Sequence, residues 1–158
     1  MIISIMSNKG GVGKTTLAIN IAYTLARKGR KVGLVDIDFH GPNLPIILGI
    51  TSKPEVTADG IIPVKVDDVE VMSLALLMRK EDDPCLWSGE TKRLMVEQMF
   101  RSVLWNNVDT FVIDTPPSLG DENLIVSDIS DTFNSILDIH DQTSLMTVKR
   151  FYRLSILF

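Results

Sequence analysis

Residues 7–16 read Ser-Asn-Lys-Gly-Gly-Val-Gly-Lys-Thr-Thr, and this stretch decides the fold. An almost unbroken apolar run, Ile2–Ile5, precedes it, and an amphipathic helical pattern follows from Thr15 to about Lys28, with Gly29 as the expected C-terminal cap. Glycines let backbone N–H groups converge on phosphates, and the positive end of the following helix adds to the attraction. The sequence therefore predicts a strand, a phosphate-binding loop and a helix, in that order.

The same stretch carries the residue types of a nucleotide site. Lys14 is expected to reach the β- and γ-phosphates, and the Thr15 hydroxyl to bind Mg²⁺. The strict pattern G-x-x-x-x-G-K-[ST] is broken at its first position, where Asn8 stands. The alternative is an ordinary glycine-rich turn with exposed lysines, which the three glycines and the Lys-Thr-Thr run disfavour. The predicted nucleotide-binding residues are Asn8, Lys9, Gly10, Gly11, Val12, Gly13, Lys14, Thr15 and Thr16.

Outward from this loop, short apolar runs alternate with helical patterns along the chain. Further strands are expected at Lys31–Asp36, Val69–Leu76, Thr110–Asp114 and Ser135–Ile139, helices at Thr91–Leu104, Glu122–Ile129 and Thr143–Leu154, a helical turn at Leu44–Leu48, and surface strands or loops over residues 51–68. Such alternation is typical of an α/β fold with a doubly wound, mostly parallel sheet. No linker interrupts the pattern, so residues 1–158 are interpreted as a single P-loop nucleotide-binding domain.

Three aspartates stand at or just beyond the ends of predicted strands. Asp36 and Asp38 follow the second strand, and Asp114 closes the strand at Thr110–Asp114. Ligands of open α/β sheets gather at the carboxyl ends of the strands, so these acids are candidates for binding a metal or orienting a water molecule. The alternative for any one of them is a helix cap or a turn residue.

The run Lys-Gly-Gly-Val-Gly-Lys-Thr-Thr at residues 9–16 resembles the deviant Walker A motif of the MinD/ParA/Mrp group of P-loop ATPases. The resemblance implies that Lys9 reaches across a nucleotide-sandwich homodimer to the phosphates of the partner subunit. It implies that Lys9, Lys14 and Asp38 are catalytic, with Asp38 positioning the attacking water. It also implies that Mg²⁺ is held by Thr15, by Asp36 and, through water, by Asp114. Residues 114–120 resemble the switch II segment of that group.

Other stretches narrow the resemblance to the Mrp-type branch. Residues 36–45, followed by Leu48-Gly49-Ile50, are similar to its D-x-D-x-x-G-P-S-x-P…L-G pattern, and residues 86–89 to its W-x-G feature. The resemblance implies a P-loop ATPase with slow hydrolysis that takes part in iron–sulfur cluster assembly or transfer to apoproteins by nucleotide-dependent dimer switching. The C-x-x-C that holds the cluster in Mrp-type carriers has no counterpart here. The one cysteine, Cys85, is interpreted as a small buried residue.

Composition excludes several other classes. The net charge of −4 argues against a nucleic-acid-binding surface, no apolar run approaches the roughly 20 residues of a membrane span, and a single cysteine fits a reducing, cytoplasmic compartment. The basic and aromatic stretch at 146–158 is interpreted as a helix covering the sheet rather than a membrane-surface helix. Members of the group continue beyond the position of Phe158, so the fold is expected to be short at the C-terminus. The preference for ATP over GTP stays open.

Two alternative functions stay open at this point. One is a MinD/ParA-like positioning or partitioning ATPase, whose partner is a membrane or DNA. The other is a nucleotide-binding module without activity.

Overall fold

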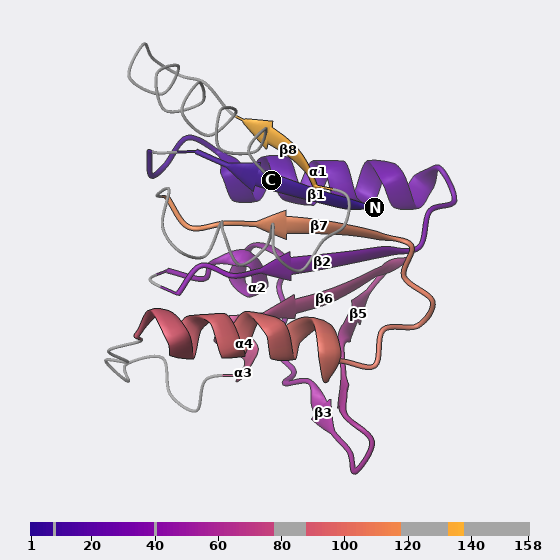
Figure 1. Cartoon of the computed structure of the whole chain (residues 1–158). Helices are drawn as coiled ribbons and strands as arrows, with labels where there is room; N and C mark the ends of the chain where they lie inside the picture. Colours follow the sequence, from indigo (N-terminus) through magenta and orange to yellow (C-terminus); the bar gives the residue numbers. More distant parts are fainter. Residues whose placement is uncertain (8, 40, 78–87, 118–132, 138–158) are drawn as a thin grey trace.

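The computed structural model describes residues 1–7, 9–39, 41–77 and 88–117, and the backbone of 133–137. Within this part of the chain, the main sheet has the strand order β5-β6-β2-β7-β1-β8 (Figure 1). Its strands are β1 (Ile2–Met6), β2 (Val32–Asp36), β5 (Val64–Val66), β6 (Val69–Ser73), β7 (Thr110–Asp114) and β8 (Phe133–Leu137). All neighbours are parallel except β5 and β6. The predicted α/β fold with a mostly parallel sheet is confirmed.

Two long helices cover the two faces of this sheet. Helix α1 (Lys14–Arg27) lies on one face and α4 (Gly89–Arg101) on the other (Figure 1). The short helices α2 (Leu44–Ile47) and α3 (Leu74–Leu77) follow β2 and β6, and the antiparallel pair β3 (Glu55–Val56) and β4 (Ile61–Ile62) extends from the main sheet. No helix among the described residues is long and apolar enough to cross a bilayer.

The core consists of two apolar clusters separated by the sheet. Successive side chains of a strand point to opposite faces, so alternate residues of β2 belong to different clusters. Leu34 packs with Ala18 and Ala22 of α1, whereas Val35 packs with Val96 and Met99 of α4. This alternation decides which polar residues at the strand ends face α1.

The ends of α1 follow the sequence prediction closely. The helix ends at Arg27, and Gly29 has a φ of 84°. The N–H of Gly29 bonds the carbonyl oxygen of Ala26 at 2.8 Å, and the N–H of Arg30 bonds that of Leu25 at 3.1 Å. These bonds satisfy carbonyl groups of the last turn, which confirms Gly29 as the C-terminal cap.

The strand predicted at Val69–Leu76 is longer than the strand in the structure. Strand β6 ends at Ser73, and Leu74–Leu77 forms α3. The side chain of Ser73 explains the change, because its hydroxyl oxygen accepts the N–H of Ala75 at 3.2 Å and so starts a helical turn. The apolar run that follows Ser73 has no periodicity that distinguishes a strand from a helix.

Two further boundaries differ from the prediction. The helix expected at Thr91–Leu104 begins at Gly89 because Ser88 caps it, with its side chain accepting the N–H of Thr91 at 3.2 Å. The strand expected at Ser135–Ile139 spans Phe133–Leu137 and pairs with β1. The helices expected at Glu122–Ile129 and Thr143–Leu154, and also Cys85, lie outside the described residues.

Candidate functional site

The carboxyl edge of the sheet brings three polar side chains together. Asp36 is in register with Asp114 of β7 on one side and with Ser73 of β6 on the other. Residues in register on parallel strands point to the same face, and the residues two positions earlier, Leu34, Val71 and Val112, pack toward α1. Asp36, Ser73 and Asp114 therefore lie on the face that α1 covers, and each is at most 3% exposed.

The glycine-rich loop between β1 and α1 has an open, concave backbone. Gly11 and Gly13 have φ values of 73° and 95°, in the region that favours glycine, and a Cβ added at either would meet no atom within 4 Å. Gly13 caps α1 without any side-chain hydrogen bond, and the first turn of α1 contains no acid. The N–H groups at this helix end are thus available to an anion, as a phosphate-binding loop requires.

Lys14 and Thr15 connect this loop to Asp114. Lys14 is only 7% exposed although it is a lysine at the start of a helix, and its charge lies close enough to Asp114 to lower the pKa of that carboxyl. The hydroxyl of Thr15 bonds the same carboxylate. Nevertheless, Oδ1 of Asp114 is buried with no hydrogen-bond partner among the described residues. A buried oxygen in that state can accept from a further donor, such as a metal-bound water.

Asp36 and Asp38 form a compact turn after β2. Oδ1 of Asp36 accepts the N–H of Asp38 at 3.0 Å, and Oδ2 accepts the hydroxyl of Ser73 at 2.9 Å. Asp38 is half-buried, and its Oδ1 accepts the N–H of Gly41 at 3.2 Å. Asp36 is therefore buried and bonds the backbone of Asp38, whereas the side chain of Asp38 lies nearer the surface of the site.

Two more bonds tie the loops to the strands beside them. The N–H of Ile37 bonds the carbonyl oxygen of Asp114 at 3.0 Å, and the hydroxyl of Thr115 donates to the carbonyl oxygen of Ile5 at 2.8 Å. Pro117 lies against the glycine-rich loop, where a Cβ on Gly10 would be 3.9 Å from the Cβ of Pro117. The segment resembling switch II thus begins in contact with the phosphate loop.

Burial strongly affects both carboxyl groups at this edge. Desolvation raises the pKa of Asp36 from 3.8 to about 7, although the N–H of Asp38 and the hydroxyl of Ser73 partly oppose the shift. Desolvation also raises the pKa of Asp114, to about 6, against the bond from Thr15 and the charge of Lys14. The charge of Asp38 adds to both shifts. A cation bound beside these carboxyl groups would lower both pKa values, because it favours the charged form of each group.

These shifts predict how the stability of the ligand-free protein depends on pH. The folded-state pKa of Asp36 lies above its unfolded value, so its contribution to stability is fully present below about pH 4 and is lost as the pH rises through about 7. Asp36→Asn cannot ionise and should therefore gain stability over the parent protein at pH 8, by about 1 kcal/mol or more, with a smaller gain at pH 5. Urea unfolding at both pH values, with exposed Asp59→Asn as the control, measures the difference. An equal effect of Asp36→Asn at both pH values would contradict it.

The donor set fits Mg²⁺ held together with a nucleotide. Magnesium prefers hard oxygen ligands and is commonly bound by one or two protein side chains, with water and phosphate oxygens as the other ligands. The described residues contain no group of three or more His, Cys, Asp or Glu that could hold a metal by itself. The hydroxyl of Thr15 and the unpartnered oxygen of Asp114 would hold the ion, which would supply positive charge beside the phosphates.

Most of the predicted site residues come together in the structure. Lys14, Thr15, Asp36, Asp38 and Asp114 meet at the carboxyl edge, as the hydrogen bonds and charge effects among them indicate. The remaining predicted residues are Lys9, Gly10, Gly11, Val12, Gly13 and Thr16, which occupy the loop and the first turn of α1, and Asn8, which is outside the described residues.

Two buried residues of the site were not among the predicted ligands. Ser73 bonds Asp36, and Thr115 bonds the end of β1. A polar residue inside a strongly apolar run was the available signal for Ser73.

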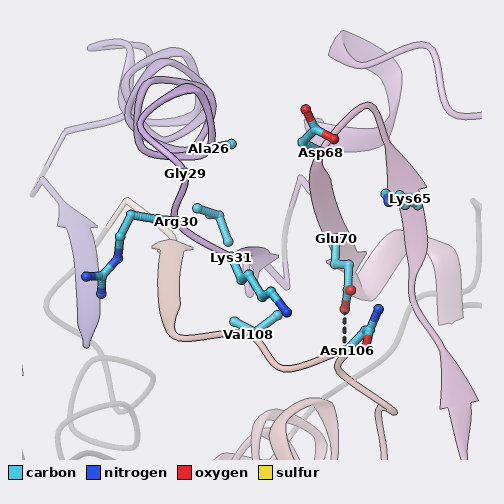
Figure 2. A pocket seen from close by; sticks show the side chains of 10 residues that line it. Ala26, Gly29, Arg30, Lys31, Lys65, Asp68, Glu70, Asn106 and Val108 are labelled. Carbon is cyan, nitrogen blue, oxygen red and sulfur yellow. Dashed lines mark hydrogen bonds between the residues drawn. The ribbon is translucent and has the colours of Figure 1, made fainter.

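A groove of about 360 Å³ lies at the opposite, amino-terminal edge of the sheet (Figure 2). Its wall includes the end of α1 and the residues that precede β2 and β7. Two of its charged groups are already engaged: Arg30 donates to Asp109 and Thr110 at 3.0 and 2.9 Å, and Glu70 accepts the N–H of Asn106 at 3.0 Å. This groove is remote from the phosphate loop and separate from the candidate site.

Comparisons with known proteins agree with this geometry. A cytosolic Fe–S cluster assembly factor NUBP2 homolog from Trichoplax adhaerens is 43% identical over 131 residues, which cover 80% of this chain and 49% of that protein. The chain thus spans about half the length of the curated relatives it matches.

Solved structures resemble the fold over nearly the whole chain. A nucleotide-binding protein from Archaeoglobus fulgidus, solved in complex with ADP, matches with a TM-score of 0.79 at 28% identity, over 97% of this chain and 61% of that one. The cell division ATPase MinD of Pyrococcus furiosus matches with a TM-score of 0.65 at 27% identity, over 98% and 67%. The family model that matches residues 1–155 is described as ParA, NUBPL iron-transfer P-loop NTPase. The chain therefore belongs to the ParA family of P-loop NTPases, whose matching model is described as the NUBPL iron-transfer P-loop NTPase.

Proposed function

We propose that the chain binds Mg-ATP at the carboxyl edge of its sheet and hydrolyses it slowly. The observation that carries this proposal is the meeting of Lys14 and Thr15 with buried Asp114, whose Oδ1 has no partner among the described residues. A phosphate loop supplies N–H donors and a lysine, and the acids beside it supply the magnesium shell and a site for water. ATP itself supplies the reacting phosphoryl group.

The proposal assigns a separate role to each charged residue. Lys14 neutralises the phosphates, and Thr15 and Asp114 hold Mg²⁺. Asp38, half-buried and held by the N–H of Gly41, orients the attacking water. Asp36 supports the magnesium shell from beneath, through its bond to the N–H of Asp38. Hydrolysis serves as a conformational signal, so a slow turnover is sufficient.

We further propose that this ATPase acts in iron–sulfur cluster assembly in the cytoplasm. The proposal is supported by membership of a family described by iron transfer and by relatives that are named cytosolic Fe–S cluster assembly factors. The cluster is the cargo, and apoproteins are its recipients. Cys85 is the one cysteine of the 158 residues, so this chain alone offers no C-x-x-C to hold a cluster. In this proposal, the chain contributes the step of cluster assembly that ATP binding and hydrolysis drive.

The assembly role can be tested in cells. Depletion of the protein should lower the activity of cytosolic iron–sulfur enzymes while their polypeptide levels stay constant. Re-expression of the parent chain should restore the activity, and re-expression of Lys14→Ala should not. Full enzyme activity after depletion would refute the role in cluster assembly and leave the nucleotide site itself in place.

A positioning or partitioning ATPase is the second candidate, favoured by the structural match to MinD. Such a protein would sediment with anionic liposomes or with DNA in the presence of ATP. An assembly ATPase should sediment with neither, because the net charge of −4 gives no general attraction to these polyanions. ATP-dependent pelleting with either one would favour the second candidate.

The proposed active form is a homodimer that closes when ATP binds. Lys9 lies on the exposed part of the phosphate loop, where its side chain could reach a second subunit. ATP added to a hydrolysis-defective Asp38→Ala background should raise the dimer fraction, and a further Lys9→Ala change should remove this effect. Sedimentation velocity measures both, with exposed Lys28→Ala as the control. A monomer that persists with saturating ATP at high protein concentration would reject the dimer.

A further inference from the structure

Ser73 lies at the end of β6, which is separated by β2 and β7 from β1, the strand that leads into the phosphate loop. It is 0% exposed, and its Cα is in register with that of Asp36. Its hydroxyl donates to Oδ2 of Asp36 at 2.9 Å, and its oxygen accepts the N–H of Ala75 at 3.2 Å. The hydroxyl proton is thus directed at Asp36, because the N–H of Ala75 is itself a donor and takes one of the lone pairs of the oxygen.

The bond from Ser73 determines how the Asp36 carboxylate is oriented. The other oxygen of that carboxylate accepts the N–H of Asp38 at 3.0 Å, so two donors on opposite oxygens fix its plane. The N–H of Ile37 is also bonded, to the carbonyl oxygen of Asp114. The backbone position at residues 37 and 38 therefore depends on bonds from two neighbouring strands. β7 supplies the carbonyl oxygen of Asp114, and β6 supplies the hydroxyl of Ser73.

We propose that Ser73 is a positioning residue for Asp38, acting through Asp36. This inference rests on the proposed function, in which Asp38 orients the attacking water. Without the hydroxyl, the Asp36 carboxylate loses one of its two fixed donors and can rotate about its χ2 angle. The side chain of Asp38 then samples more positions, and the water is less often placed for attack. Affinity for Mg-ATP depends mainly on Lys14, Thr15 and Asp114, whereas the hydrogen bonds of Ser73 are to Asp36 and Ala75.

The test compares two buried serines of the same sheet. Ser73→Ala removes the hydroxyl that bonds Asp36. Ser4→Ala removes a hydroxyl of β1 that is equally buried and has no hydrogen-bond partner among the described residues. Ser73→Ala should lower kcat for ATP hydrolysis by about tenfold or more, with the calorimetric Kd for Mg-ATP within about threefold of the parent value. Ser4→Ala should change neither, and Ser73→Thr should recover most of kcat because it retains the hydroxyl.

Amide exchange measures the positioning directly and does not require hydrolysis. In ligand-free Ser73→Ala, the amide hydrogens of Asp38 and Gly41 should exchange about fivefold faster than in the parent, as expected for a loss near 1 kcal/mol in local hydrogen bonding. Amides of β1 should be unchanged. Should the alanine variant not fold, Ser73→Cys keeps a similar shape with a much weaker donor and makes the same comparison.

The outcomes separate this inference from the proposed function. Parental kcat together with parental exchange in Ser73→Ala overturns the positioning role, and so does an equal loss of kcat and affinity, which indicates a purely structural residue. If the parent protein shows no hydrolysis above the Lys14→Ala background, the proposed function fails. The exchange of Asp38 and Gly41 then still decides whether Ser73 holds the turn.

Discussion

Lys14→Ala is expected to weaken Mg-ATP binding by at least about 100-fold, close to 2.7 kcal/mol, while the fold survives. Lys14 starts α1 and is 7% exposed, so its ammonium group lies in a region where water screens charge poorly. It is the buried cation beside the open loop at Gly11 and Gly13, where the phosphates are proposed to bind. Isothermal titration calorimetry with Mg-ATP measures the loss, and circular dichroism checks the fold.

The matched control is Lys28→Ala, at the other end of the same helix. Lys28 is exposed and follows the last residue of α1, far along the helix from the phosphate loop. Its removal lowers the net positive charge by the same amount, so any general electrostatic effect on a polyanionic ligand appears in both variants. Unchanged affinity in a folded Lys14→Ala protein would refute the assignment of the phosphate site.

Asp38→Ala should lower the rate of ATP hydrolysis by about 100-fold and leave the affinity for Mg-ATP within a few-fold of the parent. The proposed contact of Asp38 is with the attacking water, which matters in the transition state and little in the bound ground state. Single-turnover hydrolysis with saturating protein separates the chemical step from binding. A titration of the nucleotide in the same buffer gives the affinity.

Asp114→Ala provides the contrasting variant for the same measurements. Asp114 bonds Thr15 and is proposed to hold Mg²⁺, so its loss should weaken magnesium-dependent binding rather than the chemical step alone. Titrations with and without Mg²⁺ distinguish the two effects. Parental hydrolysis in both aspartate variants would show that the metal and water roles are wrongly assigned.

Local sequence features were sufficient to predict the phosphate loop. The glycines, Lys14 and Thr15 are consecutive, and the strand and the helix that flank them have clear hydrophobic periods. The acids were also predictable, because Asp36 and Asp114 each close a buried strand and parallel strands place such ends at one edge. These predictions needed only short-range patterns and one general rule about α/β sheets.

The hydrogen bond that Asp36 accepts from a neighbouring strand could not be predicted in the same way. Its partner, Ser73, is 37 residues away, and their contact depends on β6 lying beside β2 in a particular register. Shifting that register by one residue would turn Ser73 to the other face of the sheet. The end of β6 was missed for a related reason, because the same hydroxyl that bonds Asp36 also begins α3. Hydrophobic periodicity does not reveal that one serine forms hydrogen bonds with both Asp36 and Ala75.

The bonds at Ile37 and Thr115 attach the first residue after β2 and the first residue after β7 to a neighbouring strand. Ile37 is fixed to the carbonyl oxygen of Asp114, and Thr115 to that of Ile5. Both acceptors are backbone carbonyl groups of the sheet, so the positions of Ile37 and Thr115 depend on the positions of β7 and β1. A substitution that displaces β7 or β1 should therefore displace Ile37 or Thr115 with it, even when the substituted residue is remote from the phosphate loop.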